Sequence, residues 1–168
     1  MTANDVVAVI DLLAREQIDV WVDGGWGIDA LVGRETRDHA DLDLVVAQDD
    51  LDRARTALAA VGFVHDESAK PGLPARLVLV ADDGRRVDLH PVVFDAGGNG
   101  WQPLGDGAWG AYPADGLDAG GEVGGRSVRC ISPELQLRHH LGYPPDEHDR
   151  HDLRLLSERF GVGLPPGL

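Results

Sequence analysis

Cysteine and lysine are almost absent from this sequence, in which Cys130 and Lys70 are the only examples of each. A single cysteine excludes an internal disulfide and a metal cluster held by several thiolates. No apolar run approaches the roughly 18 residues that a membrane-spanning helix requires. The first residues, "MTANDVVAVIDLLARE", carry acidic side chains where a signal peptide has basic ones. We therefore expect a cytoplasmic protein with no membrane partner.

Positive charge is also scarce. The chain has 15 Lys and Arg residues against 29 Asp and Glu residues, a formal net charge of −14. This balance makes a nucleic-acid partner unlikely, because phosphate backbones attract basic side chains. An acidic surface instead suits solubility or a cationic small molecule.

Length and apolar periodicity predict one domain with a real core. We expect an α+β (α/β) fold, in which a small mixed sheet is flanked by helices and followed by a C-terminal helical segment. Capping residues and periodicity predict helices near residues 5–13, 26–33, 49–62, 132–142 and 146–161. Strands are predicted at 20–22, 41–47 and 126–131, with a hairpin at 75–92. This divides the chain into a core at 1–95, a glycine-rich acidic loop at 96–125, and a C-terminal strand and helices at 126–168, as part of the same domain or a small annex.

The segment 96–125 differs from the rest, since it holds 11 of the 22 glycines and little periodicity. From Val87 to Gly125 there is no Lys or Arg. The same span carries carboxylates and aromatic rings: Asp88, Asp95, Asp106, Asp115, Asp118, Glu122, Trp101, Trp109 and Tyr112. A long loop of this kind suits a polycationic, sugar-bearing ligand. The alternative is a solvated acidic loop in an acidic protein.

Two aspartates, Asp41 and Asp43, stand one residue apart in the strand-like "DLDLVVA". Alternation along a strand places them on one face, about 7 Å apart, while the aliphatic residues between them face a core. The same pattern recurs in "RRVDLHP", where Val87 and Leu89 alternate with Arg86, Asp88 and His90. If the two strands are neighbours, three carboxylates surround one or two Mg²⁺ ions. The alternative is a half-exposed strand of an acidic protein.

A pair of glycines, Gly24-Gly25, ends the short apolar run "VWV" and opens a predicted helix. Glycine permits close approach of a ligand to the backbone, and the N-terminus of a helix favours anions. A phosphate chain fits both properties.

The order of these features resembles the nucleotidyltransferase superfamily that shares the fold of DNA polymerase β. The sequence is most similar to the small antibiotic nucleotidyltransferases, namely the aminoglycoside 2″-adenylyltransferases and the lincosamide nucleotidyltransferases. The residues that carry the resemblance are "WVDGGWGIDALVGRETRDHADLDLVV" at 21–46, "VDLHP" at 87–91, "GRSVRCIS" at 125–132 and the "HLGY" helix with its Asp-rich successor.

The resemblance implies a role for each matching position. It implies that Asp41 and Asp43 are metal ligands, and that Asp88 is the general base or a third metal ligand. Gly24 and Gly25 would form the turn under the phosphates of the nucleotide. The remaining implied nucleotide contacts are Trp26, Arg37 and His39.

The implied reaction moves a nucleoside monophosphate, most simply AMP from ATP, to a hydroxyl of a small molecule and releases pyrophosphate. Two Mg²⁺ ions are expected, and the acceptor is expected to be an aminoglycoside or a lincosamide. A homodimer is plausible from the family. Two alternatives stay open: a minimal nucleotidyltransferase of the toxin type that modifies a protein or tRNA, and a non-catalytic nucleotide-binding relative.

Overall fold

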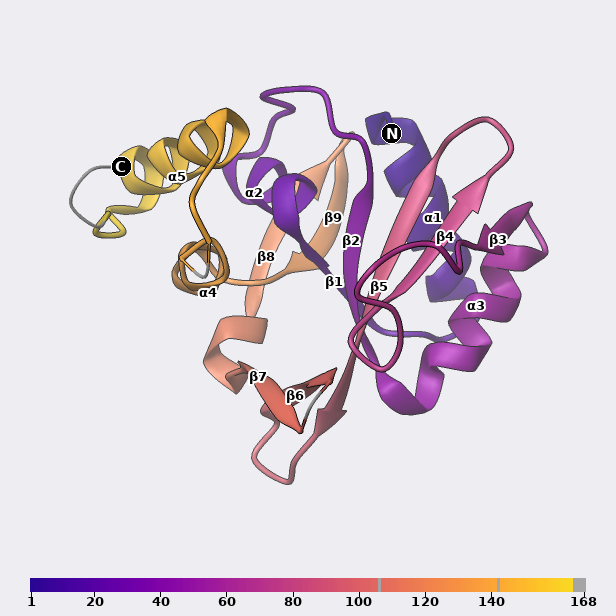
Figure 1. Ribbon diagram of the computed structural model, residues 1–168. Helices are drawn as coiled ribbons and strands as arrows, with labels where there is room; N and C mark the ends of the chain where they lie inside the picture. The colour runs from indigo at the N-terminus through magenta and orange to yellow at the C-terminus, as the bar shows by residue number, and fades with distance from the viewer. Residues whose placement is uncertain (106, 142, 165–168) are drawn as a thin grey trace.

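The computed structural model describes residues 1–105, 107–141 and 143–164 (Figure 1). The N-terminal half comprises α1 (Ala3–Arg15), β1 (Val20–Asp23), α2 (Gly24–Val32), β2 (Leu42–Ala47), η1 (Gln48–Asp50), α3 (Leu51–Ala59), β3 (Phe63–His65) and β4 (Leu77–Ala81). The C-terminal half comprises β5 (Arg86–Phe94), β6 (Gly100–Gly105), β7 (Ala108–Tyr112), η2 (Ala114–Leu117), β8 (Ala119–Val123), β9 (Arg126–Cys130), α4 (Pro133–His139) and α5 (Glu147–Phe160).

The described strands form a mixed sheet in the order β3-β4-β5-β2-β1-β9-β8. At its centre, β2 runs parallel to β5 and antiparallel to β1, and β1 runs parallel to β9. The far end of β5 leaves this order and pairs with β6, which in turn pairs with β7. The predicted mixed sheet with flanking helices is therefore confirmed.

Two apolar clusters lie on opposite faces of β2. Leu42, Leu44 and Val46 belong to the main core, together with the apolar sides of α1 and α3. Val45 faces the other way, into a smaller cluster with residues of β5, β7 and α4. Strand alternation puts Asp43 on the same face as Val45. The carboxylate therefore points toward the side where α4 and the β6–β7 ribbon lie (Figure 1).

The C-terminal helices pack on α2, whose Ile28 shares a third apolar cluster with Leu153 and Leu156 of α5. Strand β9 joins the central sheet beside β1. The predicted helices at 132–142 and 146–161 appear as α4 and α5, and the predicted hairpin at 75–92 appears as β4 and β5. Residues 165–168, the end of the predicted C-terminal segment, lie outside the described residues, as do Asp106 and Gly142.

The prediction of a loop over 96–125 is wrong. The described residues of this segment form β6, β7, η2 and β8. Periodicity was a poor guide because the strands are short and many of their positions are glycine, which has no side chain to alternate. No helix within the described ranges is long and apolar enough to cross a membrane.

Candidate active site

Three carboxylates stand in one row across the centre of the sheet. Asp23 at the end of β1 pairs in register with Asp43 of β2, and Asp43 pairs with Asp88 of β5. Side chains at directly opposed positions of neighbouring strands lie on the same face. The predicted adjacency of the Asp43 and Asp88 strands is confirmed, and Asp23 extends the row.

Two members of this row, with His90, place one oxygen or nitrogen atom each within 4.8 Å of one another. The Nε2 atom of His90 lies 3.1 Å from Oδ1 of Asp43. Arg76 donates from Nη1 to Oδ2 of Asp88 at 2.5 Å. Asp88 is fully buried, and its other oxygen, Oδ1, has no hydrogen-bond partner among the described residues. One acceptor atom is thus left available at the floor of the site.

The surroundings shift the pKa values of these groups in opposite directions. Burial raises the pKa of Asp88, and the charge of Asp43 adds to the rise, although His90 and Arg76 oppose it. Burial tends to lower the pKa of His90, but its bond to Asp43 and the nearby carboxylates outweigh this and raise the pKa to about 9. Asp88 therefore holds a proton more readily than an ordinary aspartate, and the neighbouring carboxylates favour the protonated form of His90.

Asp41 lies just before β2 and outside the group formed by Asp43, Asp88 and His90. It is half-buried, and burial together with the charge of Asp43 raises its pKa. The structure thus keeps Asp41 electrostatically close to Asp43 but does not bring it into that group. Its predicted role as a metal ligand stays a prediction.

The glycine pair forms the first turn of α2. Asp23 caps this helix, and its Oδ1 accepts a hydrogen bond of 2.7 Å from the backbone N–H of Gly24. A Cβ atom at Gly24 would collide with the carboxylate of Asp43, and one at Gly25 would collide with the side chains of His39 and Arg37. Both glycines are therefore required by close packing beside the carboxylate row, where the helix N-terminus also favours an anion.

The other predicted nucleotide contacts lie behind this turn. Trp26 is 2 % exposed and belongs to the main core. The ring of His39 packs 4.6 Å from that of Trp26, and its Nε2 lies 2.6 Å from Oδ2 of Asp29. Arg37 makes two hydrogen bonds to Asp152 of α5, at 3.1 and 2.6 Å. All three side chains thus have packing or pairing roles in the fold.

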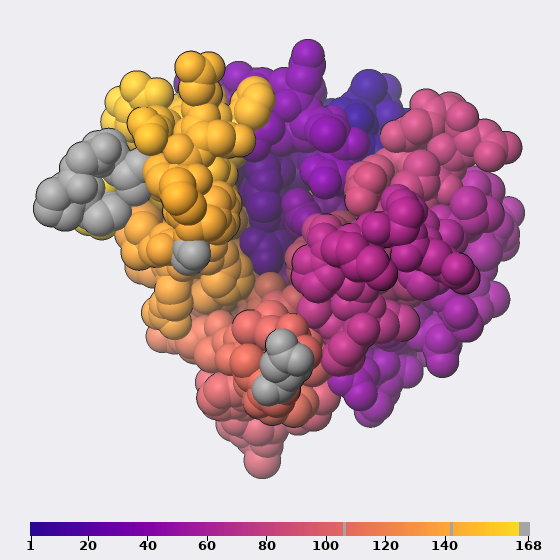
Figure 2. Space-filling view, viewed as in Figure 1, coloured from indigo at the N-terminus to yellow at the C-terminus, as the bar shows by residue number. Residues whose placement is uncertain are grey.

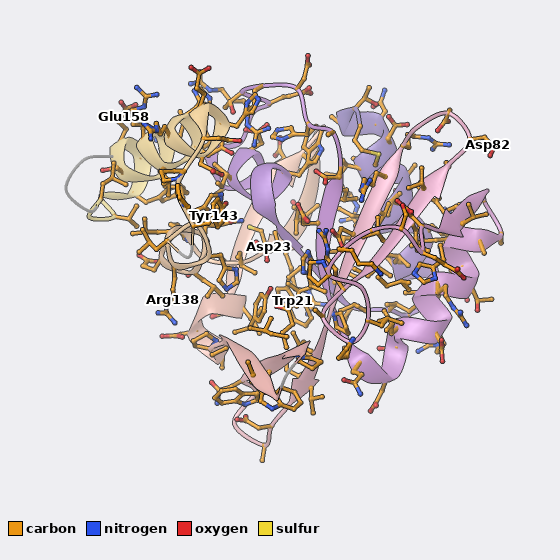
Figure 3. All side chains as sticks on the ribbon, in the orientation of Figure 1. Trp21, Asp23, Asp82, Arg138, Tyr143 and Glu158 are labelled. Carbon is orange, nitrogen blue, oxygen red and sulfur yellow. The ribbon has the colours of Figure 1, made fainter. Side chains whose placement is uncertain are left out.

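A cleft of about 560 Å³ opens above the carboxylate row. Figure 2 shows the hollow between the orange C-terminal segment and the magenta segment near residues 65–80. Figure 3 shows Asp23 deep between these two sides and Tyr143 on the α4–α5 side. The lining residues are Asp23, Gly24, Asp43, Pro71, Ala75, Arg76, His90, Gln102, Leu104, Gly110, Tyr112, His139, His140 and Tyr143.

The β6–β7 ribbon has one face in this cleft and one face outside it. Gln102 and Tyr112 face the cleft. Trp101 and Trp109 alternate with them and line a separate apolar surface with Val93. Of the acidic and aromatic residues predicted to bind a ligand from 96–125, only Tyr112 lines the cleft within the described ranges. The acidic loop predicted to bind a ligand is instead a β-ribbon, and only one of its two faces lines the cleft.

Arg76 and His139 line the cleft, although neither belongs to the predicted site residues. Arg76 follows a Pro- and Gly-containing stretch with no readable pattern, and only the fold carries it to Asp88. His139 is adjacent to His140, and a sequence does not tell which of two neighbouring histidines faces a site. The sequence does carry a signal for His90, because it lies two residues after Asp88 and therefore on the same polar face of the strand.

Comparison with known proteins accounts for this arrangement of strands and carboxylates. Residues 5–156 match the family model of the aminoglycoside-2″-adenylyltransferases. The chain belongs to this family. The predicted membership and the predicted assignment as a nucleotidyltransferase enzyme are confirmed.

Individual members of this family and fold are similar over most of their length. A "Lincosamide resistance protein" of Staphylococcus haemolyticus is 28% identical over 160 residues, which are 94% of this chain and 95% of the relative. The lincomycin-bound crystal structure of the lincosamide antibiotic adenylyltransferase LnuA is 27% identical with a TM-score of 0.82, and the match covers 94% of this chain and 97% of that one. The structure of ANT(2″)-Ia with adenylyl-2″-tobramycin shares the fold, with 21% identity, a TM-score of 0.72, and 93% and 87% coverage.

Proposed function

We propose that this adenylyltransferase-family enzyme transfers AMP from ATP to a hydroxyl of an antibiotic, with Mg²⁺ as cofactor, and releases pyrophosphate. The observation that carries the proposal is the row of carboxylates in the cleft, next to the N-terminus of α2. The similarity to LnuA, whose structure holds lincomycin, supports an antibiotic as acceptor.

The residues present fit a magnesium ion. Mg²⁺ prefers carboxylate oxygens together with substrate phosphates. Asp43 offers a carboxylate in the cleft. The partnerless Oδ1 of buried Asp88 is an acceptor atom that an ion would satisfy in the alternative role of Asp88, as a third metal ligand in place of the base. Asp41, two residues before Asp43, offers a further carboxylate that would serve as a ligand of a second ion. Bound there, Mg²⁺ supplies charge that offsets the negative charge of the triphosphate and of the attacking oxygen.

The reaction itself is an in-line substitution at phosphorus. The acceptor hydroxyl oxygen forms a bond to the α-phosphorus of ATP, and the bond from that phosphorus to the bridging oxygen breaks. Pyrophosphate leaves with the electron pair of the broken bond. Asp88 takes the hydroxyl proton, and its raised pKa makes it a stronger base than an exposed aspartate.

The acceptor side of the cleft favours a ligand that has alkyl groups as well as hydroxyls. Pro71 and Leu104 line the cleft, and Leu104 is 47% exposed. These surfaces become buried when an apolar group covers them. Asp95 is not among the residues that line the cleft, and its carboxylate is held in its own turn by Gly97 and Asn99. A lincosamide, which carries an alkyl chain beside a sugar, fits these walls better than a polycationic aminoglycoside.

The test is pyrophosphate release with Mg²⁺ and ATP across a panel of lincosamides and aminoglycosides, with Asp43→Asn as control. Release that requires a lincosamide and is lost in the variant is the expected result. Release with aminoglycosides alone would overturn the assignment of the acceptor. No release with either class would overturn the antibiotic proposal, and intact-mass shifts on lysate proteins would then test the toxin-type alternative.

A further inference from the structure

A chain of polar side chains crosses the cleft floor from Asp43 to α4. Next to Asp43 stands His90, whose Nδ1 lies 3.1 Å from Nε2 of Gln102. The hydroxyl of Tyr112 lies 3.4 Å from Oε1 of Gln102 and donates to Oδ2 of Asp23 at 3.3 Å. Side chains of β1, β2, β5, β6 and β7 thus supply one polar network, and its last member is a histidine of α4.

That last member is His139. Its Nδ1 lies 3.6 Å from Oδ2 of Asp23, an ion-pair distance, and its ring meets Tyr112 edge-on at 4.8 Å. Nδ1 therefore faces the carboxylate, and no described residue makes a hydrogen bond to Nε2. The side chain is 28% exposed and lines the cleft. Asp23 is 7% exposed, so this histidine has a buried anion behind it.

His139 lies beside the N-terminus of α2, and this position indicates which part of a bound ligand it contacts. Asp23 contacts both Gly24 N–H, the first amide of α2, and the His139 ring. Gln136, one turn earlier on α4, donates to the carbonyl of Gly24 at 3.3 Å. Helix α4 is thereby fixed against the helix N-terminus that favours an anion.

The nitrogen-bearing side chains Arg76, His90 and His140 of the lining already have partners. Arg76 binds Asp88, and His90 binds Asp43. The ring of His140 is held between the carbonyl of Gln136 and Asp149. Among the described residues of the lining, His139 is thus the basic side chain that can turn an unpartnered nitrogen toward a ligand beside α2.

We propose that His139 binds the phosphate groups of the nucleotide, and that Asp23 is a positioning residue that holds the His139 ring for this contact. The proposal rests on the proposed function, since it takes the nucleoside triphosphate as the ligand beside α2. It assigns the α4 wall to the nucleotide and leaves the Pro71 and Leu104 wall to the acceptor.

The test is direct binding of Mg²⁺ and a non-hydrolysable ATP analogue, measured by calorimetry without any acceptor. His139→Phe keeps a ring against Tyr112 but removes both nitrogens, and we expect affinity to fall about tenfold, as for loss of a hydrogen bond to a charged group. His139→Lys provides an N–H donor at the same position and should recover most of the loss. His65→Phe, on the exposed edge strand β3, is the matched control and should bind as the parent does.

Asp23→Asn tests the positioning role. Asparagine keeps an oxygen for the Gly24 amide but replaces Oδ2 with an NH₂ group that cannot accept from the imidazole. We expect a similar loss of affinity, and no further loss when Asp23→Asn and His139→Phe are combined, because coupled residues are non-additive. Thermal melting shows which variants are folded, and His139→Asn replaces His139→Phe if the latter is not.

Two results would overturn the proposal: nucleotide affinity in folded His139→Phe within twofold of the parent, or additive losses in the double variant. A parent enzyme that binds the nucleotide but adenylylates no antibiotic would instead refute the acceptor, and the His139 test would remain valid. If the parent is active and His139→Phe raises the KM for the antibiotic but leaves the KM for ATP unchanged, His139 lies on the acceptor side and the proposal is overturned.

Discussion

The pair between Arg37 and Asp152 gives the sharpest prediction on stability. Replacing Arg37 by Met keeps a long side chain but leaves the Asp152 carboxylate, only 1% exposed, without its two hydrogen bonds. Loss of one partner of a buried ion pair costs about 3–5 kcal/mol. Because Arg37 itself is 22% exposed, the lower end, about 3 kcal/mol, is expected. For a chain of this length the melting temperature should then fall by about 6–12 °C.

The assay is urea unfolding followed by far-UV circular dichroism, with thermal melting as a second measure. Arg55→Met is the matched control, because Arg55 and Asp52 form an exposed pair and its loss should cost less than about 1 kcal/mol. The double variant Arg37→Met with Asp152→Leu should recover most of the lost stability, since both charges are then absent. Two results would refute the reasoning. One is a free energy of unfolding of Arg37→Met within about 1 kcal/mol of the parent's. The other is a double variant that is no more stable than Arg37→Met alone.

The same variants examine the predicted contact of Arg37 with the triphosphate. If that contact exists, the double variant should regain stability but not affinity for Mg²⁺ and ATP. If Arg37 serves only to hold α5 against the core, affinity should return together with stability.

Three further predictions concern single side chains. Asp43→Asn should abolish measurable pyrophosphate release, because it removes the central carboxylate of the row; turnover near that of the parent would contradict the site. Asp88→Asn should lower kcat by about 10²–10⁴ yet leave nucleotide binding measurable by calorimetry, and loss of binding with it would make Asp88 a metal ligand rather than the base. Burial raises the pKa of the Cys130 thiol to about 12, so the thiol stays protonated at pH 8 and should react with Ellman's reagent only in urea; rapid reaction of the folded protein would contradict its burial.

Much of the sheet could be predicted because its central strands follow simple rules. In β2, the aliphatic residues Leu42, Leu44 and Val46 alternate with Asp43, and this pattern indicated both the buried face and the polar one. The capping residue Ser132 marked the start of α4 correctly, since its side chain caps that helix in the structure.

The walls of the site could not be predicted in the same way. Arg76 and His139 reach the carboxylate row through tertiary packing, and no local spacing records that proximity. The resemblance gave Arg37 a nucleotide contact, whereas the structure pairs it with Asp152, which lies 115 residues away in sequence. Long-range ion pairs of this kind leave no periodic signal in a single sequence.

The alignment of Asp23, Asp43 and Asp88 on three neighbouring strands has a consequence for how this enzyme can diversify. A shift of one residue in the register of β2 would turn Asp43 into the core and a leucine into the cleft. The register that buries the aliphatic residues is therefore the same one that places the carboxylates in the site. The β6–β7 ribbon and the α4–α5 connection, in contrast, supply the walls of the cleft. The pairing of β1, β2 and β5 does not depend on them. New substrates can therefore be accommodated by changing the walls, while the reactive floor is inherited unchanged.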